Sequence, residues 1–453
     1  MNTKALRQKI LDLAIHGKLV QQDPNDEPAS VLLERIRDEK ERLIKEGKIK
    51  RPKKIKTTSD KPHYENVPFE VPSSWIWSTV NEINMYNSKN VDPAKQKENT
   101  FELYSVPIFP TNTPEIIKGE KIGSAKQSVE NGDVLLCKIN PKINRVWFVK
   151  NRTENTMIAS SEWIVIRNKF MLTDYLVFCF MSPYFRDLME NNVSGVGGSL
   201  TRAQPSMVAN YAIPIPPLQE QKRIITEIKH WFELIDVIDQ GKECLQGTIK
   251  KAKSKILDLA IHGKFVPQVP TDEPASELLK RINPKAEITC DNGHYQKLPE
   301  GWVITPMQTL CALVDGEKQN GIERINLDVK YLRGEREAKV LTSGKYTTAN
   351  TLLILVDGEN SGEVFRAPVD GYQGSTFKQL SIHEEMYTDY VLQVINLHRK
   401  TLRENKVGSA IPHLNKKLFK AINVPIPPYE EQKRIVNAIN QTFTILDKIM
   451  ENL

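Results

Sequence analysis

The 453-residue chain is poor in cysteine and has no long apolar run. Its five cysteines are odd in number, are scattered and form no Cys-x-x-Cys pair, so the sequence indicates neither a disulfide framework nor a zinc site. The richest apolar run, residues 175–181, is far shorter than the roughly 20 residues that a membrane span needs. The first residues read as an amphipathic helix without the layout of a signal peptide. These absences predict a cytoplasmic protein with no membrane partner.

The patterns that mark catalytic sites are also missing. No GxxxxGK[ST] phosphate loop occurs, and Lys18 and Lys264 follow a glycine but lack the rest of that motif. Asp357 and Glu359 lack the partner lysine of a nuclease metal site, and we interpret them as part of a turn. The sequence therefore predicts no catalytic, cofactor-binding or metal-binding residues in this chain.

Positive charge is in modest excess and unevenly spread. The formal net charge is +7, which favours an anionic partner only weakly. Lysine and arginine gather between residues 45 and 61, where only Glu46 and Asp60 oppose them. This stretch is either a solvated linker or an arm that contacts phosphates.

Two repeats organise the chain around residues 213–263. The start of this stretch, IPIPPLQEQKRI at 213–224, matches VPIPPYEEQKRI at 424–435, an offset of 424 − 213 = 211. Its end, KILDLAIHGK at 255–264, is identical to residues 9–18, an offset of 255 − 9 = 246. The C-terminal and N-terminal helices together therefore rebuild a second copy of the central stretch. This arrangement predicts neighbouring termini and a pseudo-twofold axis.

Apolar spacing predicts that the central stretch is one long helix, or nearly so, which packs on the distal copy as an antiparallel coiled coil. The alternative is two separate helices buried in a globular core. The predicted seam comprises Leu6, Ile10, Leu13, Ile225, Ile228, Phe232, Ile235, Ile249, Ile256, Leu259, Val436, Ile439, Phe443 and Leu446.

Between the helices lie two related, strand-rich domains, so the sequence predicts an α+β fold. A Pro-x-x-Trp motif opens each domain, and we interpret Trp75 and Trp302 as core anchors. The predicted strands of the first domain are 108–110, 133–139, 145–150 and 163–166, followed by a helix at 174–190. The predicted segments are 1–62 (N-terminal helix, second helix and basic linker), 63–212 (first domain), 213–292 (central helical spacer and linker), 293–423 (second domain) and 424–453 (distal helical spacer).

The repeated blocks carry a resemblance that covers essentially the whole chain. KILDLAIHGK with DEPAS downstream occurs twice, as does [IV]PIPP-x-x-EQKRI, and the order is helix, domain, central helix, domain, distal helix. In these features the chain resembles the specificity subunit of type I restriction–modification enzymes.

The resemblance implies a non-catalytic subunit whose two target-recognition domains each read one half of a bipartite, asymmetric site in double-stranded DNA. It implies that the helical regions hold two methyltransferase subunits and that two restriction/translocase subunits can join, in a bacterial or archaeal cytoplasm. S-adenosylmethionine would belong to the adenine methyltransferase, and ATP and Mg²⁺ to the motor nuclease. No Asn-Pro-Pro-Tyr/Phe motif or methyl-donor loop is visible here, which agrees with that division.

Loops rich in Arg, Lys, Asn and Gln are the expected DNA contacts, because Arg and Lys suit guanine edges and Asn and Gln suit adenine. The candidates in the first domain are Lys138, Asn140, Lys142, Asn144, Arg145, Ser199 and Arg202. The candidates in the second domain are Lys318, Gln319, Arg324, Arg333, Arg336, Lys378 and His413.

The Glu-Gln-Lys-Arg blocks are either solvated helix faces or a contact shared by both halves, made with partner subunits or with the base of each recognition domain. His16 and His262 precede a helix-ending glycine and are expected to cap helix carbonyl groups. Three other readings of the whole chain stay open. It could be a stand-alone DNA-binding regulator or architectural protein, an enzyme with a hidden active site, or a coiled-coil scaffold without a nucleic-acid role.

Overall fold

The computed structural model describes residues 2–51, 67–191, 193–194, 201–285, 298–408 and 412–453. It divides into two compact units, residues 1–241 and 242–453. Helix α7 (Leu218–Ile261) has 44 residues and contributes its first part to one unit and its last part to the other, which confirms the long central helix. No helix in these described ranges combines the length and apolar character needed to cross a membrane.

Helix α7 begins later than predicted. Residues 213–215 lie in strand β12 (Ala212–Ile215), which pairs antiparallel with β1 (Ile76–Thr79). Pro214, Pro216 and Pro217 have no amide hydrogen to donate, so they are tolerated before a helix or in its first turn but not in its interior. The IPIPP block is therefore a strand that leads into the helix, so residues 213–217 of the stretch predicted as one long helix, or nearly so, precede α7.

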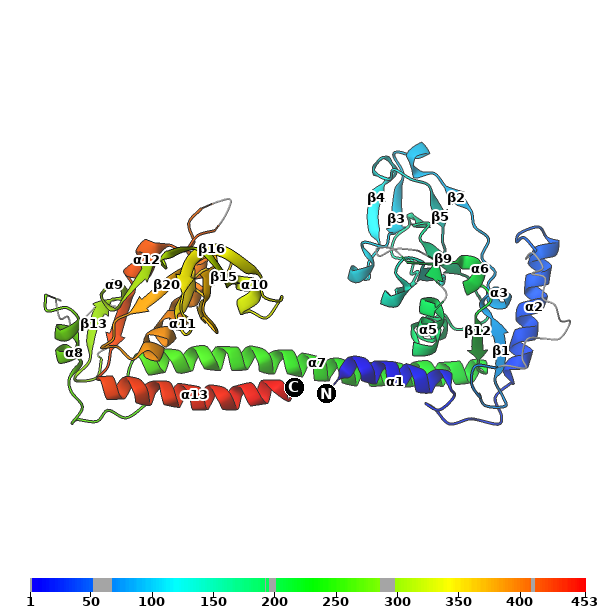
Figure 1. Cartoon of the computed structure of the whole chain (residues 1–453). Coiled ribbons are helices and arrows are strands. Elements are labelled where there is room, and N and C mark those ends of the chain that lie inside the picture. Colours follow the sequence, from blue (N-terminus) through cyan, green and yellow to red (C-terminus); the bar gives the residue numbers. More distant parts are fainter. Residues whose placement is uncertain (1, 52–66, 192, 195–200, 286–297, 409–411) are drawn as a thin grey trace. The chain divides into compact units, whose positions relative to one another are not determined.

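In the first unit, α1 (Thr3–Ile15) lies along the first part of α7 (Figure 1). Arg7 near the start of α1 contacts Asp236 at 2.6 Å, and Gln22 beyond its end contacts Glu220 at 2.6 Å, so the two helices run antiparallel. At the end of α1 the ring Nδ1 of His16 lies 2.7 Å from the carbonyl of Asp12, which confirms the expected cap. Helix α2 (Ala29–Lys45) packs its buried face on the same core.

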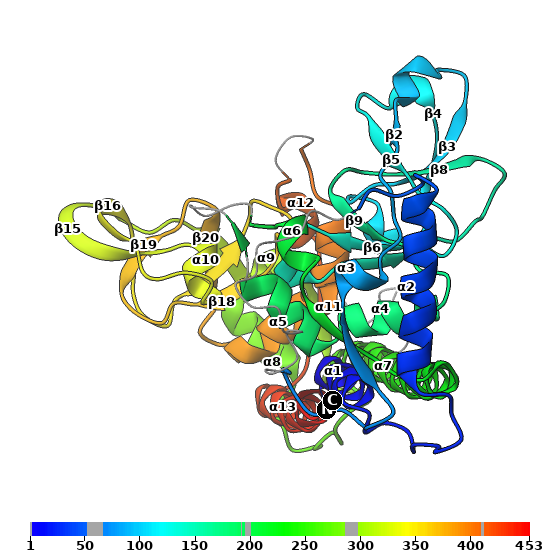
Figure 2. The same cartoon turned by 90° about the vertical axis from the view of Figure 1, so that its right-hand side faces the viewer.

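The rest of the first unit consists of an inner and an outer sheet with covering helices. The inner sheet has the order β7-β6-β9, and the outer sheet has the order β2-β5-β8-β3-β4 and projects away from α1 and α7 (Figure 2). The strands are β2 (Asn90–Val91), β3 (Thr100–Tyr104), β4 (Glu115–Lys118), β5 (Lys126–Ser128), β6 (Val134–Cys137), β7 (Val146–Phe148), β8 (Thr156–Ala159), β9 (Trp163–Ile166), β10 (Val193–Ser194) and β11 (Arg202–Ala203). The helices are α3 (Val80–Ile83), α4 (Thr173–Met181), α5 (Pro183–Asn191) and α6 (Pro205–Val208).

Two predicted elements of this unit need correction. Residues 108–110 do not form a strand, because Phe109–Thr111 form a 3₁₀ turn with Pro110 in its first half. The single helix predicted at 174–190 is two helices, α4 and α5. Ser182 between them is extended (ψ 155°), as expected for a residue that precedes a proline.

The second unit repeats this plan on the last part of α7. Helix α13 (Tyr429–Glu451) lies beside it, and Lys253 of α7 contacts Asp447 of α13 at 2.5 Å (Figure 1). Its inner sheet has the order β14-β20-β17-β18, and β15, β16 and β19 close into a small barrel. The strands are β13 (Val303–Pro306), β14 (Cys311–Val314), β15 (Lys318–Leu327), β16 (Val340–Thr347), β17 (Leu352–Leu355), β18 (Val364–Arg366), β19 (Gly371–Gln373), β20 (Phe377–Ile382) and β21 (Asn423–Ile426). The helices are α8 (Ala275–Ile282), α9 (Met307–Leu310), α10 (Val329–Leu332), α11 (Thr388–Glu404) and α12 (Lys416–Lys420).

The seam residues lie on packed faces of these helices. Ile10, Ile225, Ile228, Ile235, Ile249, Val436 and Ile439 are buried. Leu6, Leu13, Phe232, Ile256, Leu259, Phe443 and Leu446 are half-buried. The buried stripe of α7 in the second unit also includes Leu257, Ala260 and Ile261, which the a/d spacing did not select.

An anchor in the first unit joins α7 to the strand-rich domain. The indole Nε1 of buried Trp75 donates to Glu220 Oε2 at 2.9 Å, and Gln22 donates to Glu220 Oε1 at 2.6 Å. Arg223, one turn later, pairs with Asp26 at 2.6 Å. Burial raises the pKa of Glu220, while the hydrogen bonds from Trp75 and Gln22 oppose that rise.

The second unit has the same anchor at equivalent positions. Trp302 donates to Glu431 at 3.1 Å, and Gln268 donates to the other oxygen at 3.0 Å. Arg434 pairs with Asp272 at 2.5 Å. Burial also raises the pKa of Glu431, against the same kinds of donors.

The glutamine of each block completes the anchor. Gln221 accepts from the backbone N–H of Leu172 at 3.0 Å, and Gln432 accepts from that of Tyr387 at 3.0 Å. The Glu, Gln and Arg of both blocks therefore contact the base of a recognition domain or the chain that leads into it. For these three positions the alternative of a solvated helix face was wrong.

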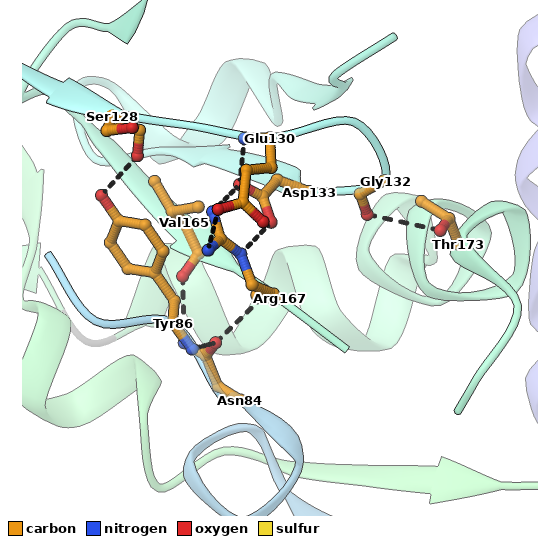
Figure 3. A network of polar contacts seen from close by, with 9 residues as sticks. All are labelled: Asn84, Tyr86, Ser128, Glu130, Gly132, Asp133, Val165, Arg167 and Thr173. Carbon is orange, nitrogen blue, oxygen red and sulfur yellow. Dashed lines mark hydrogen bonds and ion pairs between the residues drawn. The ribbon is translucent and has the colours of Figure 1, made fainter. Parts of the chain in front are cut away.

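Arg167 joins the two sheets of the first unit (Figure 3). Its Nε and Nη2 both lie 2.7 Å from the carboxylate oxygens of Asp133, and its Nη1 lies 3.0 Å from Glu130. The guanidinium also lies over the ring of Tyr86, whose hydroxyl donates to the carbonyl of Ser128 in β5 at 3.0 Å. Asp133 is only 1% exposed, and burial raises its pKa although Arg167 acts in the opposite direction.

Candidate nucleic-acid interface

The inner sheets place a pair of loops at the same position in both units. The pairing of β6 with β7 has the same register as the pairing of β17 with β18, at an offset of 364 − 146 = 218. The loop that leaves β6 spans residues 138–145, and the loop that leaves β17 spans 356–363. Each is bridged to the segment before the IPIPP block, by Ile139 to Arg202 and by Asp357 to His413. We call each bridged pair the reading loops of its unit.

Backbone hydrogen bonds fix the reading loops in the same way. Asn140 N–H donates to the carbonyl of Thr201 at 2.9 Å, and Gly358 N–H donates to that of Pro412 at 2.8 Å. Asn140 and Asn144 have positive φ values of 47° and 49°, and the matching positions in the second unit are glycines with φ of 109° and 93°. Asparagine and glycine tolerate positive φ values best, so both loops have positive φ at the same two positions although their side chains differ.

In the first unit the reading loops are basic. Lys142 is exposed at the tip, and neither Lys138 nor Lys142 has a carboxylate partner in the described part of the chain. Arg145 is directed back into the loop, where its Nη1 donates to the carbonyl of Ile139 at 3.2 Å. Arg202 pairs with Glu162 at 3.1 Å. The lysines are therefore available to a ligand, whereas both arginines already hold the loops in shape.

Asn140 and Asn144 provide the two positive φ values in the backbone of this loop. Ser199 lies outside the described residues.

In the second unit the reading loops are acidic. His413 Nδ1 lies 2.6 Å from Asp357, and Lys406 lies 2.7 Å from Glu359. Gly358 accepts from Ser361 N–H at 3.2 Å, so Asp357 and Glu359 do lie in a turn. That turn is the counterpart of the basic loop of the first unit, which the sequence interpretation missed. The sequence did contain a signal of this correspondence between the two loops, because His413 aligns with Arg202 at the offset of 211.

The other predicted cations of the second unit divide into paired and unpaired side chains. Arg333 pairs with Glu363, Arg336 with Asp328, and Lys378 with Asp315. Hydrogen bonds from two lysines, Lys345 and Lys378, hold the pKa of Asp315 well below its usual range.

Lys318, Gln319 and Arg324 lie on β15, and no carboxylate in the described residues forms an ion pair with Lys318 or Arg324. Arg324 is half-buried and lies over the ring of Tyr346. The described residues contain no group of three His, Cys, Asp or Glu side chains that could hold a metal ion.

A family model described as the type I restriction modification DNA specificity domain matches residues 72–245 and again residues 299–453. The chain belongs to this family. Each match covers one recognition domain and the helix that follows it, which agrees with the duplicated anchor and reading loops. The resemblance inferred from the repeated blocks is thereby confirmed.

Two curated relatives from Escherichia coli support the assignment. The chain is 31% identical over 405 residues to the specificity subunit of type I restriction enzyme EcoAI, covering 76% of this chain and 68% of the relative. It is 31% identical over 342 residues to the specificity subunit of EcoEI, covering 65% of this chain and 57% of that relative.

A solved structure described as the basis of complex assembly and conformational transition of the type I R-M system has a TM-score of 0.64 and 19% identity. It covers 85% of this chain and 94% of that chain. This likeness shows a shared fold and confirms the predicted combination of recognition domains and long helices.

Proposed function

We propose that this specificity-family chain is the non-catalytic DNA-reading subunit of a type I restriction–modification complex. Each unit would read one half of a bipartite, asymmetric site. The observation that carries this proposal is the contrast within the reading loops: their backbone hydrogen bonds are duplicated, while their charged side chains are not. A common frame with different side chains supports two related modules that read different bases.

The unpaired polar side chains are the proposed DNA contacts. Lys138 and Lys142 would bind DNA in the first unit, and Lys318, Gln319 and Arg324 would bind it in the second. Arg145 and Arg202 would orient the loops of the first unit, and Arg333 and His413 those of the second. Arg336 and Lys378 would hold the segments at Asp328 and Asp315 in place. A paired cation can turn to a phosphate only after it leaves its present partner, which reduces the gain in binding free energy.

The helical spacers would dock the methyltransferase subunits. Leu234 on α7 is 43% exposed, and its counterpart at the offset of 211, Ile445 on α13, is 61% exposed. Trp231 and Ile449 are exposed on the same helices. Large apolar side chains at equivalent exposed positions support the binding of two copies of one partner, because equivalent surfaces bind equivalent molecules.

The partner subunits would carry out the catalytic reactions. S-adenosylmethionine would be bound by the adenine methyltransferase, and ATP with Mg²⁺ by a restriction/translocase subunit where one is present. The chain itself would bind DNA and position those subunits in the cytoplasm.

The test is a methylome. The chain is expressed with its candidate methyltransferase in a host free of DNA methylation, and the genome is sequenced by a modification-sensitive method. We expect a split, asymmetric motif with methylated adenine only when the chain is present, and deletion of residues 293–423 should change or abolish it. A confirmed complex that gives no motif would favour a DNA-binding regulator that acts without methylation.

A further inference from the structure

The outer parts of the two units differ although their strand connections are related. In both units an early outer strand runs parallel to a later one, β3 to β8 and β15 to β19. The antiparallel pair β3–β4 has strands of only 5 and 4 residues, whereas β15–β16 has strands of 10 and 8 residues. We call the pair formed by residues 318–327 and 340–347 the ribbon. It reaches away from α11 and α13 of its unit (Figure 2).

The reading loops of the second unit are poorly suited to bind DNA alone, and the ribbon offers the cations that they lack. The cationic side chains of its reading loops, His413 and Lys406, are matched by Asp357 and Glu359, so the loops offer little free positive charge. Lys318 and Arg324 on the ribbon have no ion-pair partner within the described ranges.

Arg324 is held in place without an ion pair. Its guanidinium carbon lies 4.3 Å from the centre of the Tyr346 ring. The Tyr346 hydroxyl donates to Asp370 at 2.7 Å, and Asp370 also accepts from Ala349 N–H at 2.8 Å, so the ring is fixed. The Nε of Arg324 is buried, and none of the guanidinium N–H groups has a hydrogen-bond partner among the described residues. An arginine fixed by stacking and left with free donors is prepared to bind an acceptor pair.

The surface of the ribbon also carries exposed apolar side chains. Ile322 is 46% exposed and Val340 is 54% exposed. Ile322 lies in the irregular stretch of β15 between Asn320 and Arg324, where Gly321 has a φ of 81°. Such an irregularity bends a strand and redirects its side chains. The exposed Ile322 thus lies two residues before Arg324 in a bent part of the ribbon.

We infer that the ribbon enters the major groove of the second half-site, where Arg324 donates to a guanine and Ile322 contacts a thymine methyl group. The major groove, about 12 Å wide, admits a two-stranded ribbon with its side chains, whereas a minor groove about 6 Å wide admits one only when the DNA is deformed. Guanine O6 and N7 accept two hydrogen bonds from one arginine, and the thymine methyl group is also exposed in that groove. The two units thus read DNA with different elements, the loops in the first and the ribbon in the second. This inference rests on the proposed function.

The experiment uses the full chain in complex with its methyltransferase and a duplex that carries the motif found by the methylome. Guanines of the second half-site are replaced one at a time by 7-deazaguanine, which removes the N7 acceptor from the major groove and leaves base pairing intact. We expect one replacement to lower affinity by about 5- to 150-fold. The same replacement should have little further effect on Arg324→Gln, because this variant lacks the guanidinium group that donates to guanine O6 and N7 together.

Two further comparisons separate a lost contact from a damaged fold. Arg366→Gln makes the same chemical change in the same unit on β18, where Arg366 pairs with Asp389 at 3.2 Å, and should retain the wild-type base preference. Uracil in place of the contacted thymine should weaken binding of the wild-type complex by about fourfold, and should not weaken that of Ile322→Ala.

Two outcomes would overturn the ribbon inference. One is a second half-site without guanine, and the other is a 7-deazaguanine effect that persists unchanged in Arg324→Gln. In both cases the split motif itself would still support the proposed function. The absence of any methylated motif with the wild-type complex overturns both proposals together.

Discussion

The two units of this chain are alike where they hold the helices and different in their outer strands. The anchor around Trp75 and the anchor around Trp302 agree in residue type, hydrogen-bond pattern and the raised pKa of the glutamate. The outer parts share neither size nor closure, because one is an open five-stranded sheet and the other a small barrel. The two units are therefore most alike in the anchors that join each domain to its helix, and they differ most in their outer strands.

The same contrast continues inside the inner sheets. Arg145 at the end of the first reading loop corresponds to Glu363, and the buried pair of Asp133 with Arg167 corresponds to Thr351 and Ser381. The backbone register is thus retained while charges are exchanged or removed. Substitutions at matched positions can therefore test which parts of the two units are equivalent.

The largest expected effect comes from Arg167→Leu. It leaves the carboxylate of Asp133 buried and unpaired, which should destabilise the first unit by about 3–5 kcal/mol. We expect peptides from residues 134–166 to lose hydrogen-exchange protection, while peptides from 352–382 keep theirs. Ser381→Ala at the matched position should change stability by less than about 0.5 kcal/mol. Equal loss of protection in both units would contradict the difference drawn between them.

This variant should also respond to pH. Burial raises the pKa of Asp133, and loss of Arg167 should raise it further. A folded-state pKa above the unfolded value gives stability that is present at low pH and lost as pH rises through the folded pKa. The deficit of Arg167→Leu relative to the wild type should therefore be smaller at pH 5 than at pH 8. A deficit that is independent of pH would show that Asp133 is not the group left unpaired.

The next largest expected effects are the losses of stability caused by Trp75→Phe and Trp302→Phe. Each removes one N–H donor from a buried glutamate and should destabilise its own unit by about 1–3 kcal/mol. Because burial already raises the pKa of Glu220 and Glu431, both losses should be larger at pH 8 than at pH 5. Denaturant unfolding of the full chain should give similar values for the two variants. A twofold difference would show that the anchors are alike in geometry but not in energy.

Local patterns made much of this frame predictable. Repeated blocks and apolar spacing located α1, α7 and α13, and the Pro-x-x-Trp motif located both tryptophans. The carbonyl caps also followed from local sequence, since His262 Nδ1 lies 2.6 Å from the carbonyl of Asp258. These features depend on residues within a few turns of each other, where spacing in the sequence determines spacing in the structure.

The loops and outer strands were less predictable because they depend on pairings between residues far apart in the chain. The bridge between Ile139 and Arg202 joins segments far apart in the chain, and strand β2 has only 2 residues, too few to show alternation. Residue type also could not show which cations are already paired. Arg333 and Arg324 were equal candidates in the sequence, but one pairs with Glu363 and the other stacks on Tyr346.

A smaller effect is expected when the exposed apolar positions of the helices become charged. Leu234→Asp and Ile445→Asp should each weaken capture of the methyltransferase by at least about fivefold, because truncation of an interface anchor costs more than about 1 kcal/mol. Quantitative pull-down with a titrated methyltransferase measures the change. Val269→Asp, at an exposed position between α7 and α8, serves as the control and should leave capture unchanged. If only one of the two helical substitutions weakens capture, the spacers do not offer equivalent docking surfaces.

The smallest expected effect is a change in the salt dependence of DNA binding. It tests the contrast between the two pairs of reading loops most directly. Lys142 at the tip of the first loop corresponds to Asn360 in the second, since 142 + 218 = 360. Each protein cation that neutralises a DNA phosphate contributes about 0.9 to the slope of log affinity against log salt concentration. Lys142→Ala should therefore lower that slope by about 0.9, and Asn360→Lys should raise it by about 0.9. Lys400→Ala on α11 is the control and should not change the slope. If Asn360→Lys leaves the slope unchanged, the second pair of loops lies away from the phosphates and the matched backbones hold different positions on DNA.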